Sequence, residues 1–488
     1  MNTTDSSTRK VPLSTKIIQG TGAIPETLIH YGFGTLLLFY YNQVLGVSGM
    51  LCGYALGIAV FFDAINDPMV GSASDNFRSR LGRRHPFMYA AAIPAGIAVY
   101  LLFHPIDGLS EFQLFLWMAV FAVLVRSSMT LFVVPWQALQ AELSKDYHER
   151  TSIVAYRSLF GLATGAAAGF GVMRFLFPTT SEYTPGLLNP AGYSTYGTMA
   201  AIIVVAVILF STHFSRKEIP YLPKLSTDRQ NFTLLNVLKE MYLALQNRNF
   251  FLFFATTLLT GAMMGAIMTL AIYMHTYFWG LMPEEIAWFA LALFGSLAGF
   301  ALIKPIQKRF DKKHIALFSW SVGVADGLFL INLRLFDVLP SNDSPWLLII
   351  LVSNAIFSAF IVSLGMIIGP SLMADVLDEQ ELRTGKRQEG IFFSASGFAY
   401  KAISGLGVVV AGFIIDWLQL PRGVNPADVD PTIIRNLGIV AGICLPSLML
   451  IPIFAYGRWY TITQGRYAEI RAALDKQHAE KDAATSGD

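Results

Sequence analysis

The chain has 488 residues, of which 54% are hydrophobic and only 14% are charged. Soluble proteins carry about 25% charged residues, so this composition excludes an ordinary soluble globular protein. The formal net charge of +2 says little, because in a membrane protein the side on which charges lie matters more than their sum. Cys52 and Cys444 lie in separate apolar runs, which predicts neither a disulfide framework nor a metal site.

Apolar runs of about 20 or more residues alternate with short polar turns along the chain, which is typical of a helical protein that crosses a membrane many times. The first residues are polar, and the first apolar run is too long for a cleavable signal peptide. We therefore predict an all-α membrane protein. The twelve predicted spans are 16–42, 49–74, 86–104, 112–139, 152–177, 196–214, 250–278, 284–303, 314–333, 345–374, 390–416 and 434–459.

Lysine and arginine gather in the loops on one side of these spans, most densely in the turn at 78–84. The loops on the opposite side contain none in the first half of the chain and few in the second. By the positive-inside rule, both termini are predicted to be cytoplasmic.

The longest basic loop divides the chain into two sets of six spans. Its second part has apolar residues at helical spacing, which predicts an amphipathic helix that lies on the inner membrane surface or packs as a linker. Six plus six spans indicate a transporter built from repeats, with its site near the bilayer midplane between the halves. The predicted parts are a cytoplasmic tail at 1–15, a six-helix bundle at 16–214, the middle loop at 215–249, a second six-helix bundle at 250–460 and a cytoplasmic tail at 461–488.

The second span carries two carboxylates on an apolar background. Asp63, Asn66 and Asp67 sit at i, i+3 and i+4, so a helix places all three on one face. Two carboxylates there repel each other and are costly in hydrocarbon. They therefore need a proton, a metal cation or a basic partner.

Other ionisable and polar side chains also fall inside predicted spans. Groups at this depth often mark the path of a substrate or an ion, although they can also neutralise one another, as Glu26 and Arg126 could. For His30, a hydrogen-bonded core histidine is as good an interpretation as a proton carrier. The set comprises Glu26, His30, Arg126, Thr130, Arg157, Arg174, Asp326 and Lys401.

No sequence motif of a catalytic or nucleotide-binding site competes with these residues. HExxH, GxSxG and P-loop patterns are absent from the sequence. We therefore expect no enzyme and no direct use of ATP, which leaves a secondary transporter driven by an ion gradient. The alternative from another class is a non-transporting membrane sensor built on a transporter fold.

Two blocks of sequence carry a family resemblance that covers essentially the whole chain. Residues 71–84 (GSASDNFRSRLGRR) resemble the loop motif of the major facilitator superfamily. Residues 63–68 (DAINDP) and 374–391 (ADVLDEQELRTGKRQEGI), the latter followed by Lys401, are more specific. They closely resemble the glycoside–pentoside–hexuronide:cation symporter family, the melibiose permease-like branch of that superfamily.

The resemblance implies a major facilitator fold and a role for each matching position. It implies a coupling-cation site made of Asp63, Asn66, Asp67 and Thr130. It also implies a sugar-site arginine at Arg157 and, at Lys401, a lysine between the two halves that is linked to both sites. The loop residues with an implied gating role are Gly71, Asp75, Gly82, Arg83 and Arg84.

The chain also departs from the family pattern. Where sugar carriers of this family have carboxylates, it has Thr27 and Val133, and Arg126 stands in place of a glycine. Fewer anionic groups and an added guanidinium favour an anionic substrate such as a glucuronide or hexuronide; if Arg126 only pairs with Glu26, the substrate charge is unconstrained. The predicted substrate-binding residues are Glu26, Thr27, His30, Arg126, Trp136, Gln137, Arg157 and Lys401.

The coupling ion is predicted to be H+ rather than Na+, because two close carboxylates can share one proton. Sodium bound at Asp63 and Asp67 is the alternative, although it needs several oxygen ligands. We expect no cofactor, a small-molecule substrate, a surrounding lipid bilayer, no nucleic-acid partner and a monomer. The resulting hypothesis is a cation symporter of a sugar or glycoside that works by alternating access in a cell membrane, the inner membrane in a bacterium. A sodium-dependent lysolipid or lipid symporter is the alternative transport hypothesis.

Overall fold

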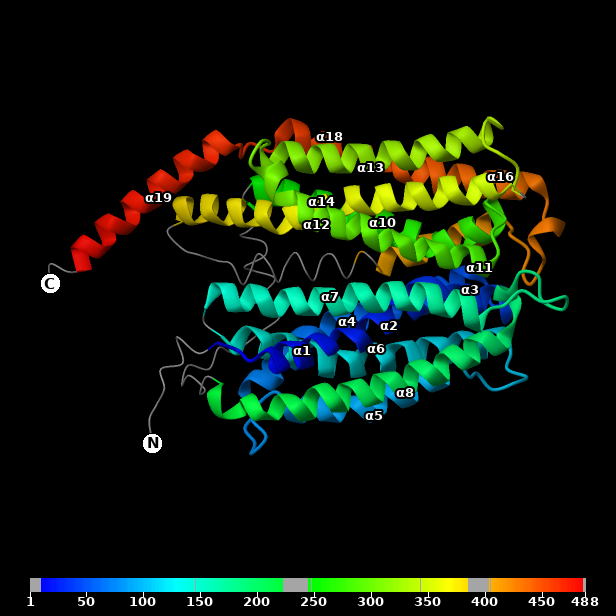
Figure 1. Ribbon diagram of the computed structural model, residues 1–488, viewed down its shortest axis with the longest axis horizontal. Helices are drawn as coiled ribbons and strands as arrows, with labels where there is room; N and C mark the ends of the chain where they lie inside the picture. Colours follow the sequence, from blue (N-terminus) through cyan, green and yellow to red (C-terminus); the bar gives the residue numbers. More distant parts are fainter. Residues whose placement is uncertain are drawn as a thin grey trace. The chain divides into compact units, whose positions relative to one another are not determined.

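The computed structural model describes residues 10–144, 146–222, 245–246, 248–342, 344–384, 403 and 405–485. Over these ranges the chain forms helices and no strand (Figure 1). Ten of the described helices are long and apolar enough to cross a membrane. The prediction of an all-helical protein is therefore confirmed for the described part of the chain.

The ten long helices overlap their predicted spans, and most begin and end near the predicted edges, but α14 continues to Thr384, beyond the predicted end at 374. Polar caps explain several of the starts: the Ser110 hydroxyl accepts from the N–H of Gln113, and the Asp311 carboxylate accepts from the N–H of Lys313. In chain order the helices are α4 (Gly49–Asn76), α5 (His85–Leu102), α6 (Glu111–Glu142), α7 with η3 (Tyr147–Gly171, Val172–Leu176), α8 (Pro190–Ser215), α10 with η6 (Arg248–Tyr273, Met274–Phe278), α11, η7 and α12 (Pro283–Ile286, Ala287–Leu291, Ala292–Gln307), α13 (Lys312–Leu335), α14 (Pro345–Thr384), and α16, η9, α17 and α18 (Pro431–Ile439, Val440–Cys444, Leu445–Leu448, Leu450–Trp459).

Two of the predicted spans differ from these ten. The predicted span 16–42 is interrupted at Gly22, between α1 and α2. Gly22 lies so close to Trp136 that an added Cβ would collide with the indole. The eleventh is described only in part, as a helix at 405–417, so the count of twelve stays a prediction. The pieces of the first span are α1 (Leu13–Thr21), α2 (Ala23–Tyr31), η1 (Gly32–Leu36), α3 (Leu37–Phe39) and η2 (Tyr40–Val44).

The middle loop begins with the short helix η5 (Arg216–Tyr221). The amphipathic helix predicted after it lies outside the described residues, apart from 245–246. After the last span, α19 (Gln464–Thr485) packs against α14 and points away from α13 (Figure 1). Most of the tail after Tyr460 is thus helical.

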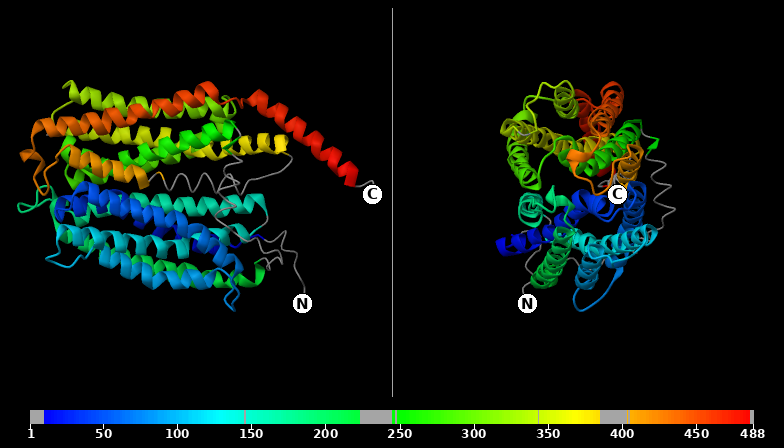
Figure 2. Two further views of the ribbon diagram at one scale, coloured as in Figure 1. Left: turned by 180° about the vertical axis from the view of Figure 1, so that it is seen from behind. Right: turned by 90° about the vertical axis from the view of Figure 1, so that its right-hand side faces the viewer.

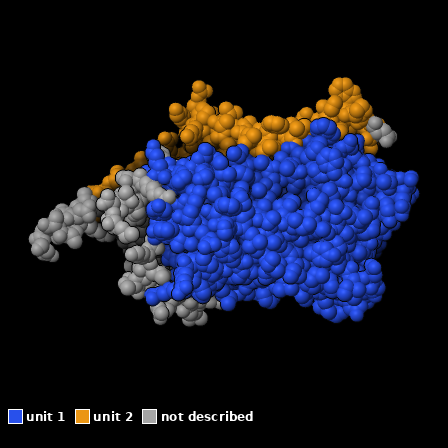
Figure 3. Space-filling view, turned by 60° about the horizontal axis from the view of Figure 1, so that its bottom comes forward, with its two compact units in different colours: residues 1–231, 265–290, 405–437 blue, residues 232–264, 291–404, 438–488 orange. Residues whose placement is uncertain are grey.

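The chain divides into two compact units (Figure 3). Unit 1 comprises 1–231, 265–290 and 405–437, and unit 2 comprises 232–264, 291–404 and 438–488. In unit 1, α6 packs against both α4 and α5, and α5 packs against α8, in a bundle whose helices run side by side (Figures 1 and 2). In unit 2, α14 packs against α12 and α13 around a buried apolar core. The two six-helix bundles predicted from the sequence stay a prediction.

Unit 1 joins α4 to a segment near the other end of the chain. The Asp416 carboxylate accepts from the N–H groups of Gly49 and Met50, both at 2.8 Å, and so caps the start of α4. A Cβ at Gly53 would lie 3.0 Å from Val409 Cα. The small residue at position 53 thus lets α4 and the helix at 405–417 pack with their backbones in close contact, as is common inside membranes.

Candidate functional site

A cluster of polar side chains joins α4 to α6 inside unit 1. Thr130 Oγ1 on α6 lies 2.9 Å from Asp63 Oδ1 and 3.0 Å from Asp67 Oδ1 on α4. Asp63 and Thr130 are buried, with 6% and 3% of their surface exposed. The structure thus brings together three of the four residues for which the sequence predicts a cation site.

Arg126 lies one helical turn before Thr130 on α6 and turns toward the same carboxylates. Its Nη1 is 3.5 Å from Asp63 Oδ2, and its guanidinium lies 4.8 Å from the centre of the Phe33 ring. With both carboxylates ionised, the side chains of Asp63, Asp67 and Arg126 together carry a formal charge of −1. One monovalent cation or one proton brings these three side chains to neutrality.

The hydroxyl of Thr130 carries a single hydrogen, although it contacts two carboxylates. It can donate to only one of Asp63 and Asp67 at a time. At the second carboxylate, two hydrogen-bond acceptors therefore face each other, which is unfavourable. The contact becomes favourable if this carboxyl is protonated and donates to Thr130, or if a cation lies beside both oxygens. The geometry therefore suits a site that takes up one positive charge.

Asn66, the fourth predicted residue, contacts α6 at a different point. Its amide Nδ2 donates to Ser127 Oγ at 2.7 Å. The sequence analysis missed Ser127, which lies beside Arg126 and three residues before Thr130. A helical projection of the fourth span would have placed it on the polar face of α6.

Trp136 is completely buried, and its indole N–H donates to the carbonyl oxygen of Gln19 at 3.1 Å. Arg157 on α7 lies 6.0 Å from the centre of its ring. Trp136 thus holds α1 against α6, and the Arg157 guanidinium lies near its face.

The remaining predicted substrate residues are spread over several elements. Glu26 and Thr27 are partly buried on α2, whereas His30 and Gln137 are exposed. A Cβ added at Gly161 on α7 would lie 3.6 Å from Thr27 Oγ1. Lys401 lies outside the described residues.

The predicted gating loop is tied to the end of α6 through Glu142, which the sequence analysis also missed. Arg84 is buried, pairs with Asp75, and donates from Nη2 to Glu142 Oε1 at 2.8 Å. Arg83 reaches the same oxygen at 2.8 Å. Arginine forks hold carboxylates with several charge-assisted bonds, so this cluster fixes the α4–α5 turn onto α6.

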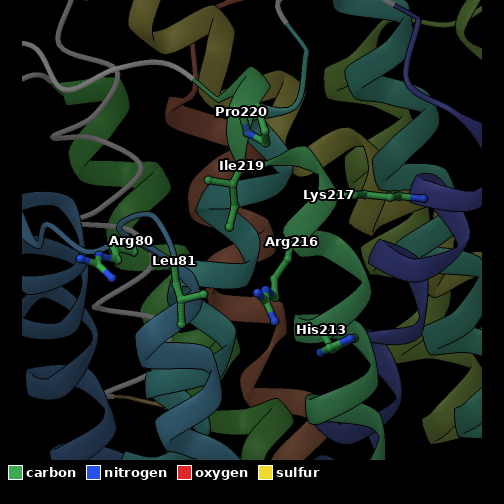
Figure 4. A pocket seen from close by; sticks show the side chains of 7 residues that line it. All are labelled: Arg80, Leu81, His213, Arg216, Lys217, Ile219 and Pro220. Carbon is green, nitrogen blue, oxygen red and sulfur yellow. The ribbon is translucent and has the colours of Figure 1, made fainter.

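The same turn borders an open cationic pocket of about 510 Å³ at the end of α8. Gly82, with φ of +75°, closes the turn in a conformation that favours glycine. Figure 4 shows Arg80, Arg216 and His213 around the pocket, with Lys217 pointing aside. Lys217 Nζ donates to Ser14 Oγ at 3.0 Å, so it is held by the start of α1. Gly71, the other predicted glycine of the motif, faces Val134 on α6.

The family described as MFS/sugar transport protein matches residues 18–463. The chain belongs to this family. It is therefore a multi-pass integral membrane protein of the transporter class, which agrees with its ten long apolar helices. The resemblance noted in the sequence is confirmed, and the relatives are transporters rather than enzymes.

Full-length relatives agree with this family, and a solved structure shows the same fold. A candidate glycoside/cation symporter of Escherichia coli, YagG, is 26% identical over 91% of both chains. A candidate sulfoquinovose importer of Salmonella typhimurium is 25% identical over 96% of this chain and 94% of its own. The crystal structure of the nucleoside transporter NupG has a TM-score of 0.60 at 13% identity, and the match covers 92% of this chain and 100% of NupG.

A lipid carrier shares only part of the sequence. The sodium-dependent lysophosphatidylcholine symporter 1 of Xenopus tropicalis is 29% identical over 33% of this chain and 31% of its own. The match to sugar-type relatives runs through the whole chain, so the lysolipid alternative has the weaker support.

Proposed function

We propose that the protein is a proton-coupled symporter of a sugar or glycoside that works by alternating access. The observation that carries the proposal is the single Thr130 hydroxyl shared by Asp63 and Asp67, with Arg126 beside them. When both carboxylates are ionised, these side chains carry a formal charge of −1, and one proton per cycle neutralises it. The family and the name of the relative YagG support the sugar or glycoside class of substrate.

The position of Arg126 favours a proton over sodium. A sodium ion at Asp63 would keep its full charge close to a guanidinium that lies 3.5 Å from the same carboxylate. A bound proton instead makes a neutral carboxylic acid, which can donate a hydrogen bond to Thr130. Repulsion between two close carboxylates also favours sharing one proton.

Arg126 also links the ion to the substrate. While Asp63 is ionised, it holds the Arg126 guanidinium. Protonation of Asp63 removes the opposing charge and releases the fork of N–H donors for an anionic group on the substrate. The buried Nε of Arg126 has no hydrogen-bond partner among the described residues, so the guanidinium has unused donor capacity. The order of binding is then proton first and anionic sugar second.

The substrate we propose is a glycoside or sugar acid that carries a carboxylate or sulfonate. The name of the Salmonella relative, a candidate importer of the sulfonated sugar sulfoquinovose, supports an anionic sugar. In this proposal Thr27, Arg126 and Arg157 face the substrate, together with Lys401 on the eleventh span. Trp136 acts by positioning Arg157.

The remaining predictions of the sequence form part of the same proposal. Twelve spans with both termini in the cytoplasm make two six-helix bundles at 16–214 and 250–460. Asp75, Arg83 and Arg84 stabilise the closed state of the cytoplasmic side by fixing the α4–α5 turn to Glu142, and the gate opens when these pairs separate.

Uptake into proteoliposomes tests the proposal. Radiolabelled glucuronate, sulfoquinovose or galactose is added outside, and an inward proton gradient or an inward sodium gradient is imposed separately. Accumulation of an anionic sugar above equilibrium with the proton gradient alone is the expected result. Accumulation that follows only the sodium gradient contradicts proton coupling, and no accumulation of any of the three sugars with either gradient contradicts the function.

A further inference from the structure

A cavity of about 230 Å³ lies in unit 1 beside α7. Engineered apolar cavities of about 150 Å³ bind benzene, so this one has room for a substituted aromatic ring. Most of its walls are apolar, and Gly165 and Gly169 leave α7 without side chains along it. The remaining lining residues are Tyr31, Thr35, Met173, Met268, Ala271, Ile272, His275, Ile286, Phe289 and Ala290.

Two polar atoms of the side chains that line the cavity are buried without a partner among the described residues. The hydroxyl of Tyr31 and Nδ1 of His275 are enclosed, and neither has a hydrogen-bond partner within the described ranges of the chain. Leaving such groups buried and unpaired costs free energy. The His275 ring lies 4.5 Å from that of Phe289, which adds an aromatic face to the same wall. An apolar space with a few convergent polar atoms is the usual composition of a small-molecule site.

The cavity continues the surface on which Thr27 lies. Thr27 and Tyr31 are four residues apart on α2, so they share one face of the helix. Gly165 borders both places: it lines the cavity, and a Cβ added to it would lie 3.7 Å from Thr27 Cγ2. A ligand that contacts Thr27 can therefore extend along α7 into the cavity, because Gly165 has no side chain to block the way.

We propose that this cavity is a subsite for an aromatic aglycone of the transported glycoside. The inference rests on the proposed function and narrows it from sugars in general to glycosides with an aryl group. The sugar lies near Thr27, and the aryl ring packs against Phe289 and the two methionines. A hydroxyl on the ring then pairs with Tyr31 or His275.

Gly169→Val is designed to fill the cavity. A Cβ at Gly169 meets no atom within 4 Å, and Gly169 lines the cavity, so there is room for a side chain to start there. Gly171→Val is the matched control, because Gly171 is in the same helix, its Cβ is equally unobstructed, and it does not line the cavity. Thermal stability of both variants confirms that each is folded.

The experiment compares methyl and phenyl β-D-glucuronides, galactosides and xylosides as inhibitors of proton-driven uptake of the free sugars. Burying a phenyl ring predicts that wild type binds the phenyl member of a pair at least about tenfold more tightly than the methyl member. Gly169→Val abolishes this preference and leaves free-sugar uptake unchanged, whereas Gly171→Val retains both. A wild type without the preference, or a Gly169→Val protein that keeps it, overturns the subsite.

A second comparison isolates the polar atoms. Wild type is expected to bind a 4-hydroxyphenyl glycoside about three- to tenfold more tightly than the phenyl glycoside, and Tyr31→Phe combined with His275→Phe removes this difference. Failure of the proposed function is distinguishable, because then no free sugar accumulates in wild type. Free-sugar accumulation with equal affinity for all aryl and alkyl glycosides overturns the subsite alone.

Discussion

Two carboxylate sites, one in each unit, show how an acidic side chain inside an apolar helix can serve structure or chemistry. In unit 2, Asp326 on α13 accepts from Asn354 Nδ2 at 2.6 Å and from the hydroxyl of Ser358, both on α14. In unit 1, Asp63 and Asp67 share one hydroxyl and lie beside one guanidinium. Asp326 has a neutral donor for each oxygen, whereas in unit 1 the hydroxyl of Thr130 contacts two carboxylates and a guanidinium lies beside them. The arrangement of donors and charges around a carboxylate thus distinguishes a candidate ion site from a structural carboxylate.

Replacing one carboxylate in each unit by an amide should affect accumulation more than any other change, and only at the unit 1 site. Asp63→Asn removes the exchangeable charge, so gradient-driven accumulation should fall at least about 100-fold, as expected when a charged group essential to coupling is lost. Asp326→Asn is the matched control. The amide oxygen still accepts from Asn354, and the amide nitrogen can donate to the Ser358 hydroxyl, so accumulation should stay within about twofold. Accumulation ratios in proteoliposomes measure both. If the two variants lose accumulation equally, the distinction between the sites is wrong.

Arg126→Gln tests the role of the guanidinium that lies beside the unit 1 carboxylates. Without this positive charge, the two carboxylates hold a proton more readily, so the midpoint of the pH dependence of uptake should move to higher pH. Affinity for anionic sugars should fall about 10- to 100-fold, since hydrogen bonds to charged groups are worth about 1.5–3 kcal/mol. Neutral sugars serve as the control. An equal loss for neutral and anionic sugars would count against a role for Arg126 in binding the substrate anion.

Thr130→Val removes the shared hydroxyl while keeping the shape of the side chain. We expect a loss of about tenfold in the apparent affinity for protons, read from the pH dependence of initial uptake rates. Thr130→Ser keeps the hydroxyl and should restore most of the affinity. A valine variant with an unchanged pH profile would show that the hydroxyl does not act in coupling.

The smallest expected effect concerns the polar clusters at the helix ends. Glu142→Gln weakens the attachment of Arg83 and Arg84, and we expect a change of about two- to fivefold in the uptake rate with an unchanged pH dependence. The unit 2 counterpart is Asp375, which accepts from Lys312 Nζ at 2.8 Å. Asp375→Asn should have a similar or smaller effect because Lys312 is partly exposed. Uptake that loses its pH dependence in either variant would place that cluster in the ion path instead.

Hydropathy and residue spacing, both readable from the sequence, define the class of the protein and most of its helices. Long apolar runs can satisfy their backbone groups in a membrane only as helices, so hydropathy located the ten long helices, although α14 continues beyond its predicted end. The spacing of Asp63 and Asp67 placed both on one face, because helical periodicity is local. The family motifs likewise lie in contiguous stretches, and the family is confirmed along 18–463.

Which side chains from different helices meet depends on tertiary packing and could not be predicted from the sequence. The sequence analysis considered Glu26 or a substrate as the partner of Arg126, whereas the structure places Asp63 there. It had no way to connect Asp416 to the start of α4 or Glu142 to Arg84, since these contacts depend on helix rotation and on close approach at small residues. The physical reason is that periodicity fixes the face on which a residue lies, while packing between helices decides what that face meets.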